Sequence, residues 1–153
     1  MDTIENKVDK SGLINLDLND FVPKGTRSVV DLKDFLYEEV MLREKDFREK
    51  IAAHDWSKYQ NHYVGITCSV DVITPLWAYM LLASALQPYA ALIIRGNKAH
   101  IEGVLLRKSI EDIDLEKYRN GRVIVKGCGG EIPESAYVAL TTLLQPVVKS
   151  LMF

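Results

Sequence analysis

Two segments of this chain share one order of residues, and this internal repeat limits the possible folds more than any other feature. The first copy covers residues 55–88 and the second covers residues 114–146. Each copy starts at an aspartate, continues into an apolar run that ends near a cysteine, and closes on Leu-Gln-Pro. The apolar run predicts a strand, and the later helical spacing of apolar residues after a proline predicts a helix. Repeated strand–helix units predict an α/β fold with a parallel sheet and right-handed crossovers.

Three strands are expected in this sheet, at residues 63–68, 91–95 and 122–127. They predict a parallel three-stranded βα core, with the order 2-1-3 favoured, so that the 63–68 strand lies in the middle. In this order the two repeated strands are neighbours. If the 91–95 strand lay between them instead, the ends of the repeated strands would be roughly 10 Å apart.

The helices of the core are expected after these strands, at residues 75–86, 97–110 and 133–144. A proline at the first helical position and a Gly-Asn pair are typical of helix starts. Tyr79, Leu82 and Leu86 recur at helical spacing, which predicts a face that packs on the sheet. Tyrosine hydroxyls on such a face need hydrogen-bond partners.

Extra strands are expected before this core. Residues 13–18 nearly alternate between apolar and polar types, residues 27–32 form a second apolar run, and residues 40–42 form a third. We expect these N-terminal strands to run antiparallel to the core. Residues 44–53 have the pattern of a helix with one apolar face. With 153 residues, 48% of them hydrophobic, the chain suits a single domain over 1–153, in which residues 1–54 supply the N-terminal strands and helix.

The charge of the chain excludes some classes of partner. The formal net charge is −2, and the lysines and arginines are scattered. This pattern argues against a nucleic-acid-binding protein and against a polybasic membrane anchor, so we expect no nucleic acid and no membrane partner. The N-terminus has no apolar segment of the kind that secretory signals contain, and a cytoplasmic location is expected. In a reducing compartment the two cysteines are then free thiols, metal ligands or transient redox partners.

Those cysteines, Cys68 and Cys128, follow the carboxyl ends of two predicted strands, where parallel sheets bind ligands. The two positions are not strictly equivalent. Val64 and Val123 are 123 − 64 = 59 residues apart, whereas the cysteines are 128 − 68 = 60 apart. Because side chains alternate along a strand, this offset of one residue places the cysteines on opposite faces unless Cys128 already lies in the loop.

Three interpretations of the two thiols stay open. They are small core residues at strand ends, or two thiolate ligands of a metal, or redox or sulfur-carrying thiols beside helix N-termini. A metal site would take further ligands from His54, Asp55, Asp71 or a partner chain. His54 and Asp55 also have a structural interpretation, since they precede Trp56 in what reads as a helix end. Asp55 and Asp114 occupy equivalent repeat positions, which favours helix capping for both.

Several short segments carry a resemblance to a known family. They are Phe47-Arg48-Glu49, His54-Asp55-Trp56, Thr67-Cys68-Ser69, Trp77-Ala78-Tyr79-Met80-Leu81, Leu86-Gln87-Pro88-Tyr89, Lys126-Gly127-Cys128, Ser135-Ala136-Tyr137-Val138 and 144–150. With Pro75, they make the chain resemble, over nearly its whole length, the uncharacterised bacterial family called domain of unknown function 2480. The family has no established activity to carry over.

The resemblance implies an accessory role in iron–sulfur cluster or sulfur handling, since genes of the family lie near iron–sulfur assembly genes. On this basis we expect a non-catalytic metal-binding protein that uses Cys68 and Cys128, with His54 and Asp55 as further ligands, for zinc or an iron–sulfur species. Two thiolates leave a four-ligand site incomplete. A homodimer, an iron–sulfur assembly partner, or a C-terminal tail with another cysteine, as the resemblance implies, would complete it. The alternatives are a thiol-dependent reductase or sulfur carrier with Cys68 as nucleophile, and a structural or partner-binding module.

Overall fold

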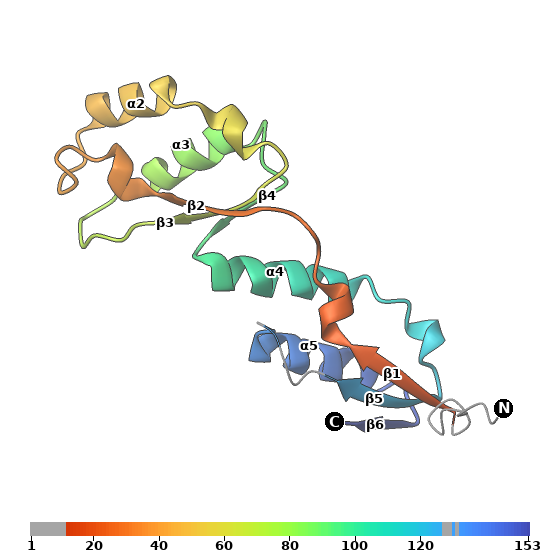
Figure 1. The fold of residues 1–153 in the computed structure, drawn as a ribbon. Helices are drawn as coiled ribbons and strands as arrows, with labels where there is room; N and C mark the ends of the chain where they lie inside the picture. The colour runs from red at the N-terminus through yellow and green to blue at the C-terminus, as the bar shows by residue number, and fades with distance from the viewer. Residues whose placement is uncertain (1–11, 127–129, 131) are drawn as a thin grey trace. The chain divides into compact units, whose positions relative to one another are not determined.

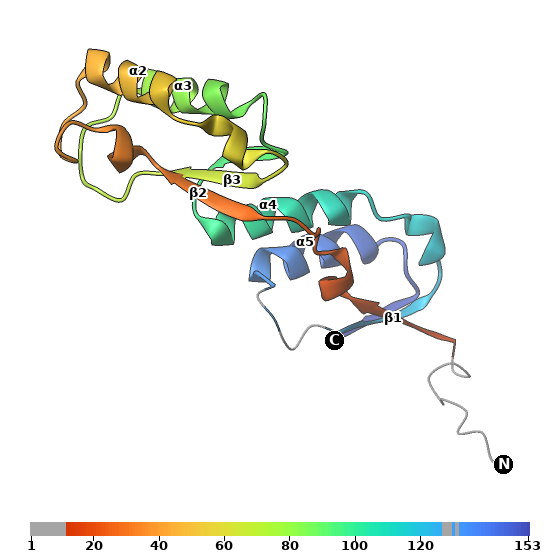
Figure 2. The same cartoon turned by 45° about the horizontal axis from the view of Figure 1, so that its top comes forward.

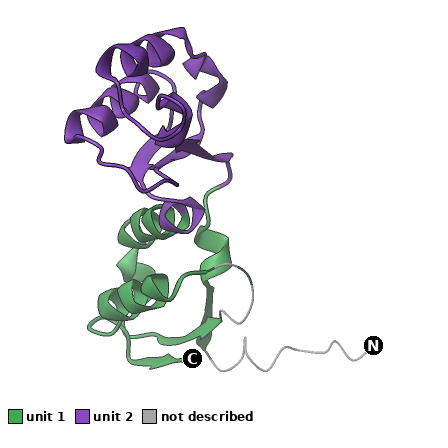
Figure 3. Ribbon diagram, turned by 90° about the vertical axis from the view of Figure 1, so that its left-hand side faces the viewer, with its two compact units in different colours: residues 1–23, 102–153 green, residues 24–101 purple. Residues whose placement is uncertain are grey.

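The computed structural model describes residues 12–126, 130 and 132–153, and Figure 1 shows the chain as a ribbon. The chain forms two compact units (Figure 3). Unit 2 is the continuous segment 24–101, and unit 1 combines residues 1–23 with residues 102–153. In the order of the chain, unit 2 is therefore inserted into unit 1. The single domain expected over 1–153 stays a prediction.

Unit 2 is built on a parallel three-stranded sheet, sheet B. Its elements, in chain order, are β2 (Arg27–Asp31), η2 (Leu32–Phe35), α2 (Glu44–Ala53), η3 (Trp56–Tyr59), β3 (Tyr63–Thr67), α3 (Leu76–Leu86) and β4 (Leu92–Arg95), where η marks a 3-10 helix. The strand order is β2-β3-β4 and both pairs are parallel. Helices α2 and α3 cover the same face of this sheet (Figures 1 and 2).

Unit 1 has the same kind of sheet, sheet A. Its elements are β1 (Leu13–Asp17), η1 (Leu18–Phe21), α4 (Lys98–Glu111), η4 (Leu115–Lys117), β5 (Arg122–Lys126), α5 (Glu134–Leu144) and β6 (Ser150–Met152). The strand order is β1-β5-β6, again with parallel pairs. The boundary between the units falls within α4, after Ile101.

The repeat is therefore longer than the two segments recognised in the sequence. Each unit contains a strand, a 3-10 helix, an α-helix, a second 3-10 helix, a strand, an α-helix and a strand. The registers agree as well, since the last residues of the first strands, Asp17 and Asp31, lie opposite Lys126 and Thr67, the last residues of β5 and β3. The first part of the repeat, which was not recognised in the sequence, does have a sequence signal. It is the segment Asp-Leu-x-Asp-Phe, which occurs at 17–21 and at 31–35.

The α/β class and the parallel three-stranded arrangement are confirmed. The strand order 2-1-3 is wrong, because β5 belongs to sheet A whereas β3 and β4 belong to sheet B. The antiparallel direction expected for the N-terminal strands is also wrong, because β1 and β2 run parallel to their neighbours. Each is an edge strand of one sheet. The physical reason is that a helix crosses between successive strands of each unit, and such crossovers produce parallel pairs. Residues 40–42 make no strand of their own, and the bridge found there joins Tyr37 to Met41.

Each unit has its own hydrophobic core between its sheet and its helices. Phe47, Val64 and Leu82 are fully buried in unit 2, and Val123 and Leu140 are fully buried in unit 1. The apolar helix face expected on α3 is thus confirmed. No helix of the described residues is long and apolar enough to span a membrane.

The opposite face of sheet B is approached closely by the chain that follows β4. A Cβ atom added to Gly65 in the central strand would overlap the carbonyl oxygen of Gly96 and would lie 3.3 Å from the Ile101 Cδ1 atom. Gly96 has a φ of +149°, which favours glycine, and Asn97 and His100 exchange hydrogen bonds at the start of α4. The glycine at position 65 therefore lets the first turn of α4 lie against β3.

Candidate functional site

The candidate site lies at the carboxyl end of sheet B, where the chain leaves β3 for α3. Cys68 follows β3 directly, is half-buried, and packs against the core of unit 2. Its thiol donates a hydrogen bond to the Val70 carbonyl oxygen, with a sulfur–oxygen distance of 3.3 Å. Since Val64 and Ile66 face the helices, Cys68 continues the same side of the strand.

The loop that begins at Cys68 is held by a carboxylate from the neighbouring strand. Asp31, the last residue of β2, accepts hydrogen bonds from the backbone N–H groups of Lys33 and Ser69, at 3.0 and 3.2 Å. Burial alone would raise the pKa of Asp31, but the hydrogen bonds from Ser69 and Lys33 outweigh it and lower that pKa. The carboxylate is thereby kept ionised and is already occupied by protein donors.

Arg95 lies at the same end of the sheet, and its role was not predicted from the sequence. Its Nη1 donates to the carbonyl oxygen of Ile66 at 3.1 Å, and its guanidinium carbon lies 5.0 Å from the centre of the Tyr79 ring. The Tyr79 hydroxyl pairs with the Thr74 hydroxyl at 3.2 Å, which satisfies the expected need for a partner. The available sequence signal was the position of Arg95 as the last residue of an otherwise apolar strand.

His54 lies in an aromatic cluster at the end of α2. The centres of the Phe35, Trp56 and Tyr59 rings lie 5.4, 4.5 and 6.2 Å from the centre of its ring. Its Nε2 atom is buried and has no hydrogen-bond partner. Burial, with a smaller contribution from Lys58, lowers the pKa of His54, and this favours the neutral imidazole. Trp56 packs into the core and donates to the Ile51 carbonyl oxygen at 2.8 Å.

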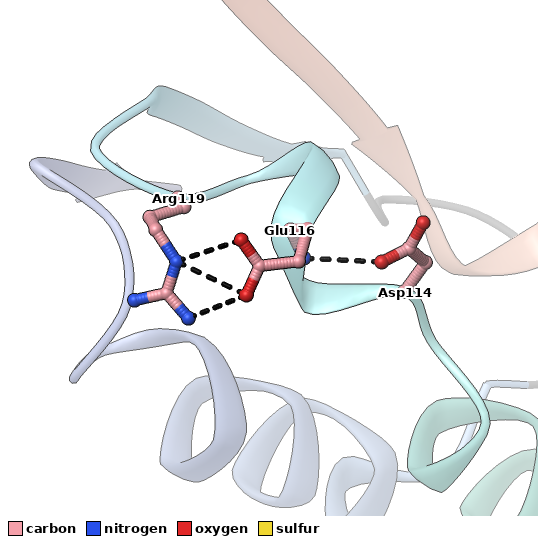
Figure 4. A network of polar contacts seen from close by, with 3 residues as sticks. All are labelled: Asp114, Glu116 and Arg119. Atoms are coloured by element: carbon pink, nitrogen blue, oxygen red, sulfur yellow. Dashed lines mark hydrogen bonds and ion pairs between the residues drawn. The ribbon is translucent and has the colours of Figure 1, made fainter.

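Asp55 and Asp114 are both helix caps, as their equivalent repeat positions predicted. The Asp55 carboxylate accepts from the Ser57 N–H and hydroxyl, and these bonds lower its pKa. Figure 4 shows the matching cap in unit 1, where Asp114 accepts from the Glu116 N–H at 3.1 Å and the Glu116 side chain pairs with Arg119.

The other two 3-10 helices are capped in the same way. Asp17 accepts from the N–H of Asn19, and Asp31 accepts from that of Lys33. In the described part of the chain, each of the four 3-10 helices thus begins at an aspartate whose side chain accepts from the backbone N–H two residues later. One local motif, used four times, fixes how each chain segment enters its 3-10 helix.

The expected metal ligands are not gathered in the part of the chain that the structure describes. Within residues 12–126, 130 and 132–153 there is no group of three or more His, Cys, Asp or Glu side chains that could hold a metal ion. Cys128 lies outside the described residues. The strands that precede Cys68 and Cys128 are β3 and β5, which belong to different sheets. These two strands are therefore not neighbours. The expectation that neighbouring strands would bring the two thiols together does not hold.

An apolar stripe follows Cys68 along the chain. Ile73, Leu76 and Met80 are 96%, 81% and 68% exposed. Leu76 and Met80 are one helical turn apart on α3, and Ile73 lies in the loop before it. Large apolar side chains are usually buried, and a contiguous exposed group of them is typical of protein-binding surfaces. We call these three residues the apolar stripe.

Comparison with known proteins places the chain in a family without assigning it an activity. No curated protein and no solved structure matches the chain. One family model matches residues 2–153, which is essentially the whole chain. The chain therefore belongs to the family described as "Protein of unknown function (DUF2480)".

Proposed function

We propose that this protein is a non-catalytic accessory protein that binds a protein partner through the apolar stripe of unit 2. The observation that carries the proposal is the exposure of Ile73, Leu76 and Met80 on one short segment. Burying such side chains against a partner would contribute about 25 cal/mol per Å² of apolar surface. A second copy of the chain is the first partner to test, since it needs no other protein.

The narrower form of the proposal concerns the Cys68 thiol, which lies five residues before the stripe. In this form Cys68 contributes one thiolate to a zinc or iron–sulfur site, and the remaining ligands come from Cys128, a second copy, or an iron–sulfur assembly protein. Its support is the position of Cys68 at a sheet end that commonly binds ligands, together with the role in cluster assembly that the family resemblance implies. His54 and Asp55 are weaker candidates, because one is enclosed by rings and the other is a cap.

Binding of a second copy of the chain is tested by sedimentation equilibrium of the full chain over a range of concentrations. We expect self-association that Met80→Glu weakens at least tenfold, because a buried carboxylate without a partner is costly. The control is Val138→Glu, since Val138 occupies the equivalent exposed position on α5. A wild-type chain that stays monomeric, or equal effects of the two variants, would contradict a second copy as the partner.

The metal is tested separately by elemental and labile-sulfide analysis of protein purified anaerobically without chelator. The narrower proposal predicts bound zinc, or iron with sulfide, that is lost in Cys68→Ala and retained in Asp55→Asn. A metal-free full-length protein, or a metal content unchanged by Cys68→Ala, would contradict it.

A thiol-dependent reductase or sulfur carrier with Cys68 as nucleophile is the second candidate. It is favoured by the partial exposure of Cys68 at the open end of the sheet. This candidate predicts that Cys68 is alkylated faster than a model thiol at neutral pH. Slow alkylation would instead favour a packing role for Cys68.

A further inference from the structure

Arg95 is an exposed residue at the carboxyl end of sheet B, and two contacts orient its side chain. Its Nη1 atom is bound to the Ile66 carbonyl oxygen, and its guanidinium lies over the Tyr79 ring. The Tyr79 hydroxyl is in turn hydrogen-bonded to Thr74 from the β3–α3 loop. A guanidinium has five N–H donors. Two contacts therefore fix the group, while further donors stay available for a ligand.

No carboxylate among the described residues neutralises this guanidinium. Four other arginines differ in this respect, since each forms an ion pair with a nearby acid on its own helix or turn. These pairs are Arg43–Asp46, Arg48–Glu44, Arg107–Glu111 and Arg119–Glu116. Arg95 differs from these four arginines, because its protein contacts are a carbonyl oxygen and an aromatic ring. Arg27 has contacts of the same kind, with the Gly25 carbonyl oxygen and the Tyr63 ring.

Asp31, an acidic residue at the same end of the sheet, does not pair with Arg95. Asp31 ends β2, which is separated from β4 by the central strand β3. Two strand spacings amount to about 10 Å. The Asp31 carboxylate also accepts from the N–H groups of Lys33 and Ser69. Asp31 therefore does not neutralise the Arg95 guanidinium.

We propose that the carboxyl end of sheet B binds a small oxyanion, of the phosphate or carboxylate class, through the Arg95 guanidinium and beside the Cys68 thiol. Guanidinium groups bind such anions through paired N–H donors. Cys68 lies two residues after Ile66, whose carbonyl oxygen holds Arg95, and on the same side of the sheet. Arg95 thereby selects anionic ligands at the position where the thiol is partly exposed. This site does not depend on the partner surface proposed above.

Unit 1 has no arginine at the position of its last strand that is equivalent to Arg95. In sheet B, Arg95 lies opposite Ile66 of the central strand, two residues beyond the Val64–Ile93 pair. In sheet A, the residue equivalent to Arg95 in the strand β6 and its continuation is Phe153, which carries no charge. The two units therefore share a backbone plan but differ in the chemistry of this sheet end.

The test uses Cys68 as a reporter in a Cys128→Ser background, so that one thiol remains. Its alkylation rates with iodoacetate, an anion, and iodoacetamide, its neutral counterpart, are compared at neutral pH. We expect an iodoacetate-to-iodoacetamide ratio roughly three- to tenfold above that of a model thiol, because a cation lies close by. Inorganic phosphate should slow the iodoacetate reaction selectively.

Two variants decide the outcome, with thermal unfolding used to confirm that each is folded. Arg95→Gln should return the ratio to that of the model thiol and abolish the phosphate effect. Arg122→Gln is the matched control, since Arg122 is an exposed arginine of sheet A. It should change neither the alkylation ratio nor the effect of phosphate. A ratio that Arg95→Gln leaves unchanged, or a wild-type ratio equal to that of the model thiol, would overturn the proposal.

Discussion

At the scale of single residues, His54 is the group whose ionisation should affect stability most directly. Its Nε2 atom is buried without a partner, and its ring packs between Phe35 and Trp56. Burial lowers its pKa below the ordinary value of 6.5, with Lys58 acting in the same direction and Asp55 and Asp34 acting against it. The unfolded chain therefore takes up the proton first as the pH falls.

From this order of protonation we expect His54 to reduce folding stability as the pH falls through about 6.5, with the loss levelling off below the pKa of the folded state. His54→Phe keeps the ring packing and removes the titration. The free energy of unfolding of His54→Phe minus that of wild type should therefore be larger, meaning a relatively more stable variant, at pH 5.5 than at pH 7.5. Urea unfolding at the two pH values measures this difference, and an equal difference at both would contradict the role of His54.

Gly65 is the second residue with a clear consequence. Because an added Cβ would overlap the Gly96 carbonyl oxygen, Gly65→Ala should destabilise the protein by about 1–3 kcal/mol, as overpacking does. The control is Gly103→Ala within α4, where the nearest atom to a new Cβ is the Ser135 Oγ at 4.0 Å. That change should stabilise the helix by about 0.5–1 kcal/mol. Chemical unfolding of both variants tests the opposite signs.

At the scale of elements, the aspartate caps determine how the 3-10 helices begin. Asp31 is the cap with most partners, since it also holds Ser69. Asp31→Ala should cost about 0.5–2 kcal/mol, and Asp31→Asn should cost less, because asparagine caps almost as well. Thermal unfolding distinguishes the two. Equal losses for both variants would mean that the charge, rather than capping, stabilises this position.

The turn at residues 37–41 is strained by its sequence. Glu38 and Glu39 have φ values of +49° and +60°, and the Val40 N–H bonds to the Tyr37 carbonyl oxygen. Two positive φ values in a row are typical of a type I′ turn, which favours Asn-Gly. The double variant Glu38→Asn, Glu39→Gly should raise stability by about 1 kcal/mol. Unfolding at neutral pH checks this, and a loss of stability would contradict the assignment of the turn.

The elements themselves could largely be predicted from the sequence, and the reasons are local. Proline and Gly-Asn pairs marked the starts of α3, α4 and α5, and apolar spacing marked their buried faces. Pro75 was expected at the first helical position of α3, but it occupies the cap position, and the Thr74 hydroxyl before it binds Tyr79. The strand β6 was not among the expected strands, because three residues are too few to show a period.

The candidate site was less predictable than the elements around it. The position of Cys68 followed from the end of a strand, and the capping role of Asp55 followed from its repeat partner. Arg95 could not be assigned, because its role depends on Tyr79 and Ile66, which are distant in sequence. Contacts between distant residues leave no local pattern in a single sequence.

At the scale of the whole molecule, the division into two sheets was missed for the same reason. Alternation along a strand identifies the strand but not the strand with which it pairs. The pairing of β1 with β5 joins residues more than a hundred positions apart, since 122 − 13 = 109. The short segment Asp-Leu-x-Asp-Phe, present twice near the N-terminus, is the sequence signal that could have assigned β1 and β2 to two separate units.

Because each unit has its own hydrophobic core, a cavity made in one core should destabilise that unit more than the other. Leu82 and Leu140 occupy equivalent, fully buried positions in α3 and α5. Each change to alanine should cost about 2–5 kcal/mol. Hydrogen exchange should show faster exchange within unit 2 for Leu82→Ala and within unit 1 for Leu140→Ala. Equal acceleration in both units would mean that they unfold together.

The insertion of unit 2 into unit 1 has a consequence for synthesis on the ribosome. Unit 2 is complete once residue 101 has emerged, whereas β1 must wait until β5 has been made. From Asp17 to Arg122 this is 122 − 17 = 105 residues, or roughly 5–20 s at ordinary rates of translation. During that time β1 has free backbone groups and the sequence of a strand. The nascent chain therefore carries an exposed edge that a chaperone, or another nascent chain, can bind before its own partner exists.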